Sequence, residues 1–411
     1  MMKSSRLIAF ETLYKIFYDV SYSNLALESA LSDVKDDKAF ISALVYGVVE
    51  RKITLDYYIS KYLDKKAKPK IMIILLMGAY QLLYMDKIPD NAAINESVEL
   101  AKIIKQDFYT RLINAVLHKI ANDSEKIDET YLKYSVPQNL LNMWYKQYGK
   151  EIVDNFLPYI NGRPPVFAIP NTLYVDSEEL SYELLSDGIE CEPFNDVVLI
   201  NSSFDLKKSR AFNNGLFHIE DLSSYECACM LDAKENDTVL DLCSAPGGKA
   251  FTIAERMNNK GKIYAFDLYE HRIKLINSGA ERLGIDIIKT GINDAVIFNE
   301  NLPVADKILC DVVCSGLGII RRKPEIRYKN LDSIKELPKL QLEILTTSSR
   351  YLKQGGTLVY STCALNKKEN EKVVNAFLND NENFILEKEK TCFPGEYGGD
   401  GFYMAKLIKN Y

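Results

Sequence analysis

Histidine, tryptophan and closely paired cysteines are scarce in this sequence. Three histidines and one tryptophan occur among 411 residues, and the eight cysteines form no repeated Cys-x-x-Cys pair. With so few imidazoles and no such thiol pairs, the sequence predicts neither a metal site nor a disulfide framework. We therefore expect free thiols in a reducing compartment, most of them small core residues.

Long apolar runs and a targeting leader are also missing. The most apolar stretch, residues 71–85, is too short to span a bilayer, contains Gln81 and is followed by Asp86 and Pro89, so it predicts a buried helix. The first residues run directly into an amphipathic helical pattern without a leader. We expect a cytoplasmic protein that does not contact a membrane.

The composition is that of a folded chain of two or three domains. The apolar fraction is 47%, and the net charge of −6 does not by itself suggest a nucleic-acid partner. One local basic concentration lies between two apolar helical segments, and its members are Arg51, Lys52, Lys61, Lys65, Lys66, Lys68 and Lys70. A solvated helix face and a surface for RNA phosphates are both open interpretations of this run.

Three regions follow one another along the chain. Residues 1–125 show helical periodicity throughout and predict an all-α domain. Residues 126–225 predict a connecting helix and a small α+β module, because short helix and strand patterns alternate with proline and glycine. Residues 226–411 alternate strands with helices, which predicts a mostly parallel sheet with helices on both faces.

Several acids and one thiol stand where the predicted strands of this last region end. The strands are expected at 238–242, 262–266, 285–288, 307–310 and 357–361. The side chains that close or follow them are Asp241, Asp267, Asp294, Asp311 and Cys363. Because ligands of open parallel sheets bind at the carboxyl ends of the strands, these residues predict a binding and reaction site.

The turn after the first of these strands is built for a small ligand. Gly247 and Gly248 separate the strand from a helical run and leave room for close approach to backbone N–H groups. The phosphate-binding patterns G-x-G-x-x-G and G-x-x-x-x-G-K-[ST] are both absent, which argues against a dinucleotide or a nucleoside triphosphate.

Motifs along nearly the whole chain resemble one enzyme family. The strings DLCSAPGGKAF, DVVCSGLGIIRRKPEIRYK and VYSTCAL resemble motifs of the RsmB/Sun family of RNA cytosine-5 methyltransferases. The segments LVYGVVERKITLDYYI and RLINAVLHKI resemble the NusB-like, RNA-binding domain of that family. The resemblance implies a multidomain fold: a NusB-like all-helical domain, a small α+β linker module, and a Rossmann-like, class I methyltransferase domain that uses S-adenosylmethionine.

The same resemblance implies roles for individual residues. Cys363 would be the nucleophile that adds to cytosine C6, Cys314 would aid release, and Asp311 would orient the cytosine and also face the cofactor. The cofactor residues would be Cys243, Ser244, Ala245, Pro246, Gly247, Gly248, Lys249, Asp267, Arg272, Asp294 and Asp311. The alternatives are a helix N-cap for Asp267, a turn aspartate for Asp294 and a core side chain for Cys243.

Two segments near these motifs need separate comment. Val313 stands where the family commonly has proline, so a constraint on the backbone of the Cys314 loop is missing. Downstream, Arg321, Arg322, Lys323, Arg327 and Lys329 suit either a solvated helix face or a clamp on the phosphates beside a cytosine turned out of its stack.

The sequence thus predicts a monomeric cytosine-C5 methyltransferase acting on small-subunit (16S) rRNA. One alternative is the same chemistry on tRNA or on another rRNA site. Another is a protein that binds RNA or a transcription factor and whose methyltransferase fold is vestigial. An inactive domain would have no need of both thiols, which favours the enzyme.

Overall fold

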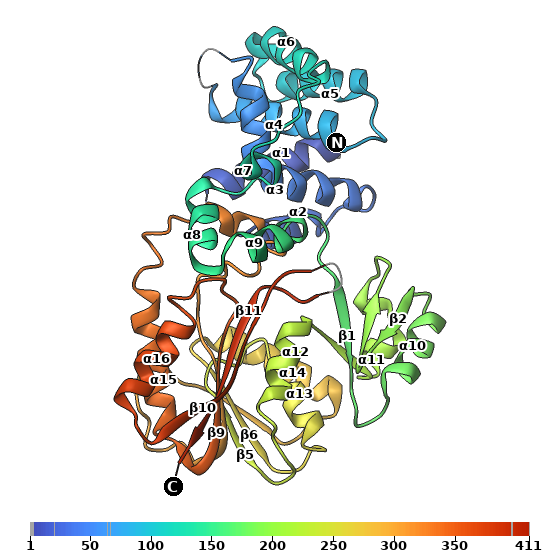
Figure 1. Cartoon of the computed structure of the whole chain (residues 1–411). Helices are drawn as coiled ribbons and strands as arrows, with labels where there is room; N and C mark the ends of the chain where they lie inside the picture. The colour runs from blue at the N-terminus through green and yellow to red at the C-terminus, as the bar shows by residue number, and fades with distance from the viewer. Residues whose placement is uncertain (1–3, 20, 64, 66, 396–397, 411) are drawn as a thin grey trace. The chain divides into compact units, whose positions relative to one another are not determined.

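The structure is a computed structural model that describes residues 4–19, 21–63, 65, 67–395 and 398–410, and it divides into two compact units (Figure 1). One unit comprises Met1–Arg163 with Ile320–Lys329, and the other comprises Pro164–Ile319 with Asn330–Tyr411. The short segment 320–329 therefore packs with the N-terminal unit. The divisions expected after residues 125 and 225 stay predictions.

The first unit is helical. Its elements are α1 (Ser5–Tyr18), α2 (Ser23–Leu31), α3 (Lys38–Ser60), α4 (Pro69–Tyr84), α5 (Asp90–Ile103), α6 (Thr110–Ala121), α7 (Thr130–Lys133), α8 (Gln138–Tyr148) and α9 (Lys150–Phe156), with 3-10 turns at Asp107–Tyr109, Leu157–Tyr159 and Pro324–Tyr328. Helix α4 begins with proline and buries its apolar residues in the core of this unit, as expected for residues 71–85. Among the described residues, no helix is long and apolar enough to cross a membrane.

The inserted segment 320–329 is anchored through Arg327, which is 1% exposed. Its guanidinium donates hydrogen bonds to the backbone carbonyls of Glu50, Ser135 and Ile160 and to Asn161 Oδ1. A guanidinium that is buried and engaged in this way has no donor left for RNA, so the interpretation of Arg327 as part of a phosphate clamp is wrong.

The second unit contains a small antiparallel sheet with strand order β2-β3-β1-β4. Its elements are β1 (Val166–Pro170), α10 (Ser177–Ser186), β2 (Cys191–Phe194), β3 (Val197–Ile200), a 3-10 turn at Leu206–Lys208, α11 (Arg210–Asn213) and β4 (Phe217–Glu220). A capping box of Asp176 and Glu179 begins α10. This part of the unit is the small α+β module that the sequence predicts.

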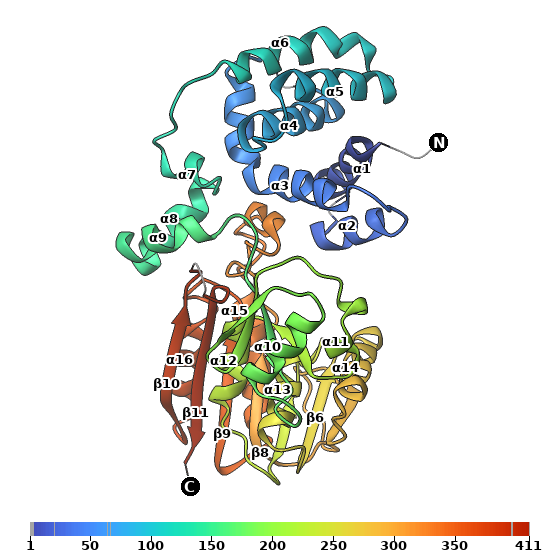
Figure 2. The ribbon, with the colours of Figure 1, turned by 90° about the vertical axis from the view of Figure 1, so that its right-hand side faces the viewer.

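The same unit contains a seven-stranded mixed sheet with order β10-β11-β9-β8-β5-β6-β7 (Figure 2). Its elements, after α12 (Leu222–Met230), are β5 (Thr238–Asp241), α13 (Gly248–Arg256), β6 (Lys262–Asp267), α14 (Glu270–Leu283), β7 (Ile288–Ile292), β8 (Ala305–Asp311), α15 (Leu337–Ser349), β9 (Leu352–Thr362), α16 (Glu371–Asp380), β10 (Phe384–Cys392) and β11 (Phe402–Lys409). Strands β5 to β9 are parallel, and β10 and β11 are antiparallel additions at one edge.

Helices cover both faces of this sheet. Figure 1 shows α12, α13 and α14 on one face and α15 and α16 on the other. Each face has its own apolar core, one around Ile253 and Ile276 and the other around Ile344 and Phe377. The architecture predicted from the sequence, a helical domain, a small α+β module and a mostly parallel sheet with helices on both faces, is confirmed.

One strand lies later than the sequence predicts. The strand expected at 285–288 is observed at Ile288–Ile292. The difference arises because Ile285 completes the end of α14, donating its backbone N–H to the Ala280 carbonyl after Gly284 takes a φ of +67°.

Candidate active site

The order in which strands are added to the parallel part of the sheet reverses between β5 and β8. From β5 the strands β6 and β7 extend to one side, whereas β8 and β9 extend to the other. Asp241 ends β5, Asp311 ends β8, Asp267 ends β6, and Cys363 follows β9 directly. These side chains therefore lie at the switch point, where sheets of this type bind ligands.

The two predicted catalytic thiols lie in direct contact. Cys314 Sγ and Cys363 Sγ are 3.1 Å apart, although the residues are 49 positions apart in sequence. Both side chains are neither fully buried nor fully exposed. The contact with Cys363 and burial together raise the pKa of Cys314 well above its usual range, so the Cys314 thiol holds its proton at neutral pH.

Asp311 stands at the centre of a short polar network. Its Oδ2 accepts a hydrogen bond of 2.8 Å from Lys249 Nζ, and its Oδ1 accepts one of 2.8 Å from Ser361 Oγ. Lys249 Nζ also lies 3.2 Å from Ser224 Oγ. Burial by itself lowers the pKa of Lys249, but the Asp311 carboxylate outweighs that effect and raises it, so the ion pair stays charged.

This ion pair was missed by the sequence analysis, which placed Lys249 only among the cofactor residues. Lys249 is the second residue of α13, and Asp311 is the last residue of β8, 62 positions later in the sequence. Sequence spacing carries no signal for such a contact. The one feature that could have suggested an ion pair is a lysine at the start of a helix that directly follows a turn expected to bind a ligand.

The turn after β5 requires its glycines. Gly247 has a φ of +111°, and a Cβ there would lie 2.6 Å from the ring of Phe251. A Cβ at Gly248 would lie 2.8 Å from the Glu220 carboxylate. The turn is tied to the sheet by the Ser244 N–H, which donates to the Phe266 carbonyl. The first backbone N–H groups of a helix have no partner within the helix itself, so the start of α13 suits a polar ligand.

Asp267 is held in place by the turn and by Arg272. The Arg272 guanidinium donates to Asp267 Oδ1 at 3.1 Å and to the Ala245 carbonyl at 2.7 Å. Asp267 also accepts the N–H groups of Ala245 and Tyr269, and it is 3% exposed. Arg272 therefore braces both the acid and the turn. The alternative of a helix N-cap for Asp267 is wrong, because the N-cap of α14 is Tyr269.

Three buried polar atoms near the ends of β5 and β7 have no hydrogen-bond partner within the described part of the chain. They are Asp241 Oδ2, Ser244 Oγ and Asn293 Nδ2. Burial raises the pKa of Asp241 to about 7. Buried polar atoms in native proteins are normally satisfied, so an acceptor and a donor left open at a switch point fit a polar ligand.

The remaining predicted cofactor residues have simple local surroundings. The Cys243 N–H donates to Asp241 Oδ1 at 3.4 Å, and the Cys243 side chain packs against the apolar core on the α15 face. Asp294 is exposed and accepts the N–H of Val296 at 3.0 Å, which is the geometry of a turn aspartate. Its expected place near an adenine amine stays a prediction.

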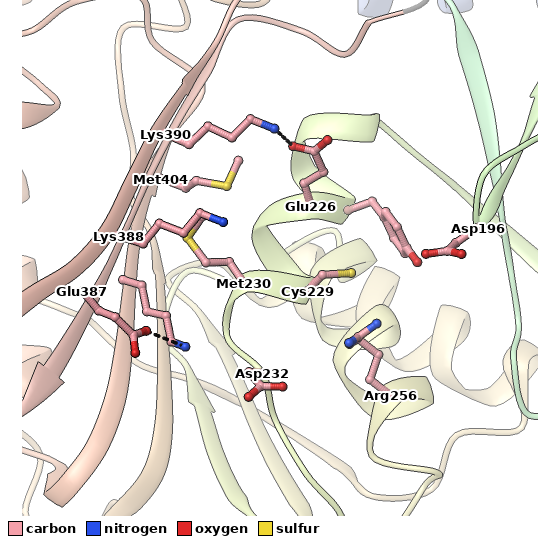
Figure 3. Close-up of a pocket in the computed structure, with 12 residues that line it drawn as sticks. Asp196, Glu226, Cys229, Met230, Asp232, Arg256, Glu387, Lys388, Lys390 and Met404 are labelled. Atoms are coloured by element: carbon pink, nitrogen blue, oxygen red, sulfur yellow. Dashed lines mark hydrogen bonds and ion pairs between the residues drawn. The ribbon is translucent and has the colours of Figure 1, made fainter.

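A separate cavity of about 700 Å³ lies on the α12 face of the second unit (Figure 3). Its lining includes Cys229, Arg256, Lys390 and Met404, and none of the predicted catalytic or cofactor residues. Two lining lysines are already paired, among them Lys390 with Glu226. No group of three possible metal ligands occurs in the residues that the structure describes.

The chain matches two family models. Residues 228–408 match the model described as 16S rRNA methyltransferase RsmB/F, and residues 3–122 match the NusB family. A protein of Bacillus subtilis (strain 168) named probable ribosomal RNA small subunit methyltransferase B is 36% identical, and the match covers all of both chains. A ribosomal RNA small subunit methyltransferase B of Proteus mirabilis (strain HI4320) is 31% identical over 96% of this chain and 97% of its own.

A solved structure supports the same relationship. The crystal structure of PH0851 superposes with a TM-score of 0.83 at 28% identity and covers all of both chains. The expected family resemblance is therefore confirmed by sequence along the whole chain and by structure. This chain belongs to the RsmB/F family of 16S rRNA methyltransferases.

Proposed function

We propose that this protein methylates C5 of a cytosine in small-subunit (16S) rRNA and that the reaction passes through a covalent bond between Cys363 and cytosine C6. The observation that carries the proposal is the pair of thiols 3.1 Å apart that follow β8 and β9, at the carboxyl ends of the parallel strands. The names of the Bacillus and Proteus relatives support rRNA as the substrate class.

The chemistry of cytosine explains why two thiols are needed. Cytosine C5 is a poor nucleophile, but addition of the Cys363 thiolate to C6 moves electron density onto C5. After C5 is alkylated, a base takes the C5 proton, the electron pair of the C5–H bond forms the C5–C6 double bond, and Cys363 leaves C6 as a thiolate, which restores the aromatic ring. Cys314 is close enough to Cys363 to assist this release, and its raised pKa keeps it protonated while Cys363 attacks.

Asp311 is suited to orient the cytosine. Its two carboxylate oxygens each accept one hydrogen bond, from Lys249 and Ser361. A carboxylate can accept about four hydrogen bonds, so acceptor capacity remains for the exocyclic amine of a base. Lys249 and Ser361 fix the orientation of the carboxylate, which favours such a bond.

The site also fits S-adenosylmethionine, which when bound supplies an electrophilic methyl group. The expected cofactor residues are Cys243, Ser244, Ala245, Pro246, Gly247, Gly248, Lys249, Asp267, Arg272, Asp294 and Asp311. Asp267 offers carboxylate oxygens for a ribose diol, and the open acceptor of Asp241 suits an ammonium group.

The RNA would be bound with help from the N-terminal region. We infer that residues 1–125 form the RNA-binding domain, that residues 126–225 connect it, and that residues 226–411 perform the reaction. The match of residues 3–122 to the NusB family supports the first of these assignments. The protein is expected to act as a monomer.

The proposal is tested with wild type, Cys314→Ala and Cys363→Ala. Each is incubated with unmodified small-subunit rRNA and methyl-labelled S-adenosylmethionine, and protein–RNA adducts are resolved on denaturing gels. Cys314→Ala should accumulate a labelled adduct, whereas Cys363→Ala should form none and transfer no methyl. Unmodified tRNA is tested in parallel, because preferential transfer to it would change the substrate.

Other outcomes would overturn parts of the proposal. An adduct that depends on Cys314 would reverse the roles of the thiols. Methylation that neither substitution affects would exclude the covalent mechanism. RNA binding by wild type without S-adenosylmethionine binding in calorimetry would favour a binding protein with a vestigial methyltransferase fold.

A further inference from the structure

A cluster of buried polar side chains lies behind the two thiols. Glu369 and Asn370, in the connection from β9 to α16, are both 0% exposed, and so is Gln341 of α15. Asn366 is 3% exposed and donates to Glu369 Oε1 at 2.8 Å. Burying a carboxylate and several amides costs free energy unless their hydrogen bonds compensate, so the bonds that they make are informative.

Glu369 and Gln341 hold the peptide groups on both sides of Cys314. The Ser315 N–H donates to Glu369 Oε2 at 2.8 Å, directly after Cys314. Gln341 Nε2 donates to the Val313 carbonyl at 3.0 Å, directly before Cys314, and to Glu369 Oε2 at 3.1 Å. Both partners of Gln341 can only accept, so the orientation of its amide is determined.

Asn370 makes the corresponding contacts around Cys363. Thr362 Oγ1 donates to Asn370 Oδ1 at 2.6 Å, directly before Cys363. Asn370 Nδ2 donates to the Ala364 carbonyl at 2.8 Å, directly after it. Asn370 therefore brackets Cys363, whereas Cys314 is bracketed by Glu369 on one side and Gln341 on the other.

We propose that Glu369 and Asn370 are positioning residues that hold Cys314 and Cys363 against each other, and that Gln341 completes the clamp on the Cys314 side. The effect of this clamp on catalysis rests on the proposed function, because both thiols take part only in the proposed reaction. The backbone at Val313 is not restrained by a proline ring, and the Val313 side chain is 52% exposed. The bond from Gln341 supplies the restraint that is otherwise missing.

The first test uses the adduct assay to distinguish the contacts around Cys314 from those around Cys363. Gln341→Met keeps the length of the side chain and removes its donor, so the Cys314 loop is released. The adduct should then decay about tenfold more slowly than in wild type, which is the size of effect expected from losing the buried hydrogen bond between Gln341 Nε2 and the Val313 carbonyl. Asn370→Asp removes the bond to the Ala364 carbonyl and should slow adduct formation by a similar factor.

The matched control is Gln81→Met. Gln81 is likewise a buried glutamine, 1% exposed, but it lies in α4 of the first unit and donates to the Met77 carbonyl. Its replacement should leave adduct formation and decay at wild-type rates. The affinity of every variant for S-adenosylmethionine, measured by calorimetry, should stay within twofold of wild type.

The second test does not depend on RNA or on the proposed reaction. Iodoacetamide alkylates Cys314 and Cys363 in the full chain without RNA, and mass spectrometry measures the rate at each thiol. Gln341→Met should change the rate mainly at Cys314, and Asn370→Asp mainly at Cys363, each at least threefold. Glu369→Gln keeps the shape of the side chain and should change the alkylation rate mainly at Cys314, as Gln341→Met does. It replaces Gln341→Met in the assay if that variant does not fold.

The outcomes distinguish this inference from the proposed function. Equal effects of both substitutions on the two thiols, or no effect on either, would overturn the clamp. If each substitution changed the alkylation rate mainly at its own thiol while wild type transferred no methyl group, the clamp would be supported and the proposed function rejected.

Discussion

Replacement of Arg327 by methionine should destabilise the first unit strongly. The guanidinium is buried and donates to the carbonyls of Glu50 and Ser135 at 3.0 and 3.1 Å, to Ile160 O at 3.2 Å and to Asn161 Oδ1 at 2.8 Å. Removing it leaves these four acceptors, and also the carbonyls of Pro324 and Ile320, without their donor.

The magnitude follows from these bonds. A hydrogen bond to a charged group contributes about 1.5–3 kcal/mol, but the effects are not additive and water can enter the space, so we expect a loss of about 3–5 kcal/mol. For a unit of this size, that loss lowers the Tm by about 10 °C. Arg327→Lys should recover little of it, because a lysine ammonium has three donors on a flexible stem and cannot reach acceptors spread around a planar group.

The assay is thermal unfolding of the full chain, combined with hydrogen exchange of peptides from α3 and from residues 157–163. Loss of protection should concentrate in these peptides. Arg111→Met, at an exposed position on α6, is the control and should change stability by less than about 0.5 kcal/mol. If Arg327→Met kept its Tm and its exchange protection but bound rRNA more weakly, the structural role would be refuted in favour of a phosphate contact.

Three further predictions concern the second unit. Lys249→Met leaves the Asp311 carboxylate without its ion pair and should slow rRNA methylation by about 100-fold or more, whereas a rate close to wild type would remove Lys249 from the mechanism. Gly247→Ala places a side chain at a φ of +111° with an aromatic ring 2.6 Å away, so S-adenosylmethionine binding in calorimetry should weaken at least about tenfold; unchanged affinity would show that the turn is not the cofactor site. Burial alone would lower the pKa of His218, but Glu255 and a second carboxylate raise it from 6.5 to about 9. The contribution of protonated His218 to the free energy of unfolding is therefore complete below pH 6.5 and is lost as the pH rises to about 9. It amounts to at most about 3 kcal/mol, and urea unfolding at pH 6, 7.5 and 9 should show a decline that His218→Leu abolishes; the same decline in that variant would assign it to other groups.

Much of the architecture follows from local patterns in the sequence. The apolar run at 71–85 became the buried helix α4, and the strand patterns ending at Asp267 and Asp311 became β6 and β8. These patterns succeed because periodicity and turn residues act within a few positions of the chain. The strand near 288 was placed too early, because Ile285 was already used to end α14.

The candidate site was predictable only in its residue types. Parallel strands carry their carboxyl ends to one edge, so acids and thiols that end strands could be grouped from the sequence. The partner of Lys249 and the acceptors of Arg327 could not be predicted, because those contacts join residues far apart in the chain. Basic residues in one short run thus have different roles, and Arg327 is structural.

The sequence by itself determined the order of helices and strands, the glycine turn, and the identity of the residues at the strand ends, because each depends on interactions between near neighbours. The tertiary structure decided that Cys314 and Cys363 touch, that Asp311 is paired with Lys249, and that buried side chains of the β9–α16 connection and of α15 hold the backbone on both sides of each thiol. Those arrangements depend on strand order and on burial away from water, and neither is a property of any short stretch of chain.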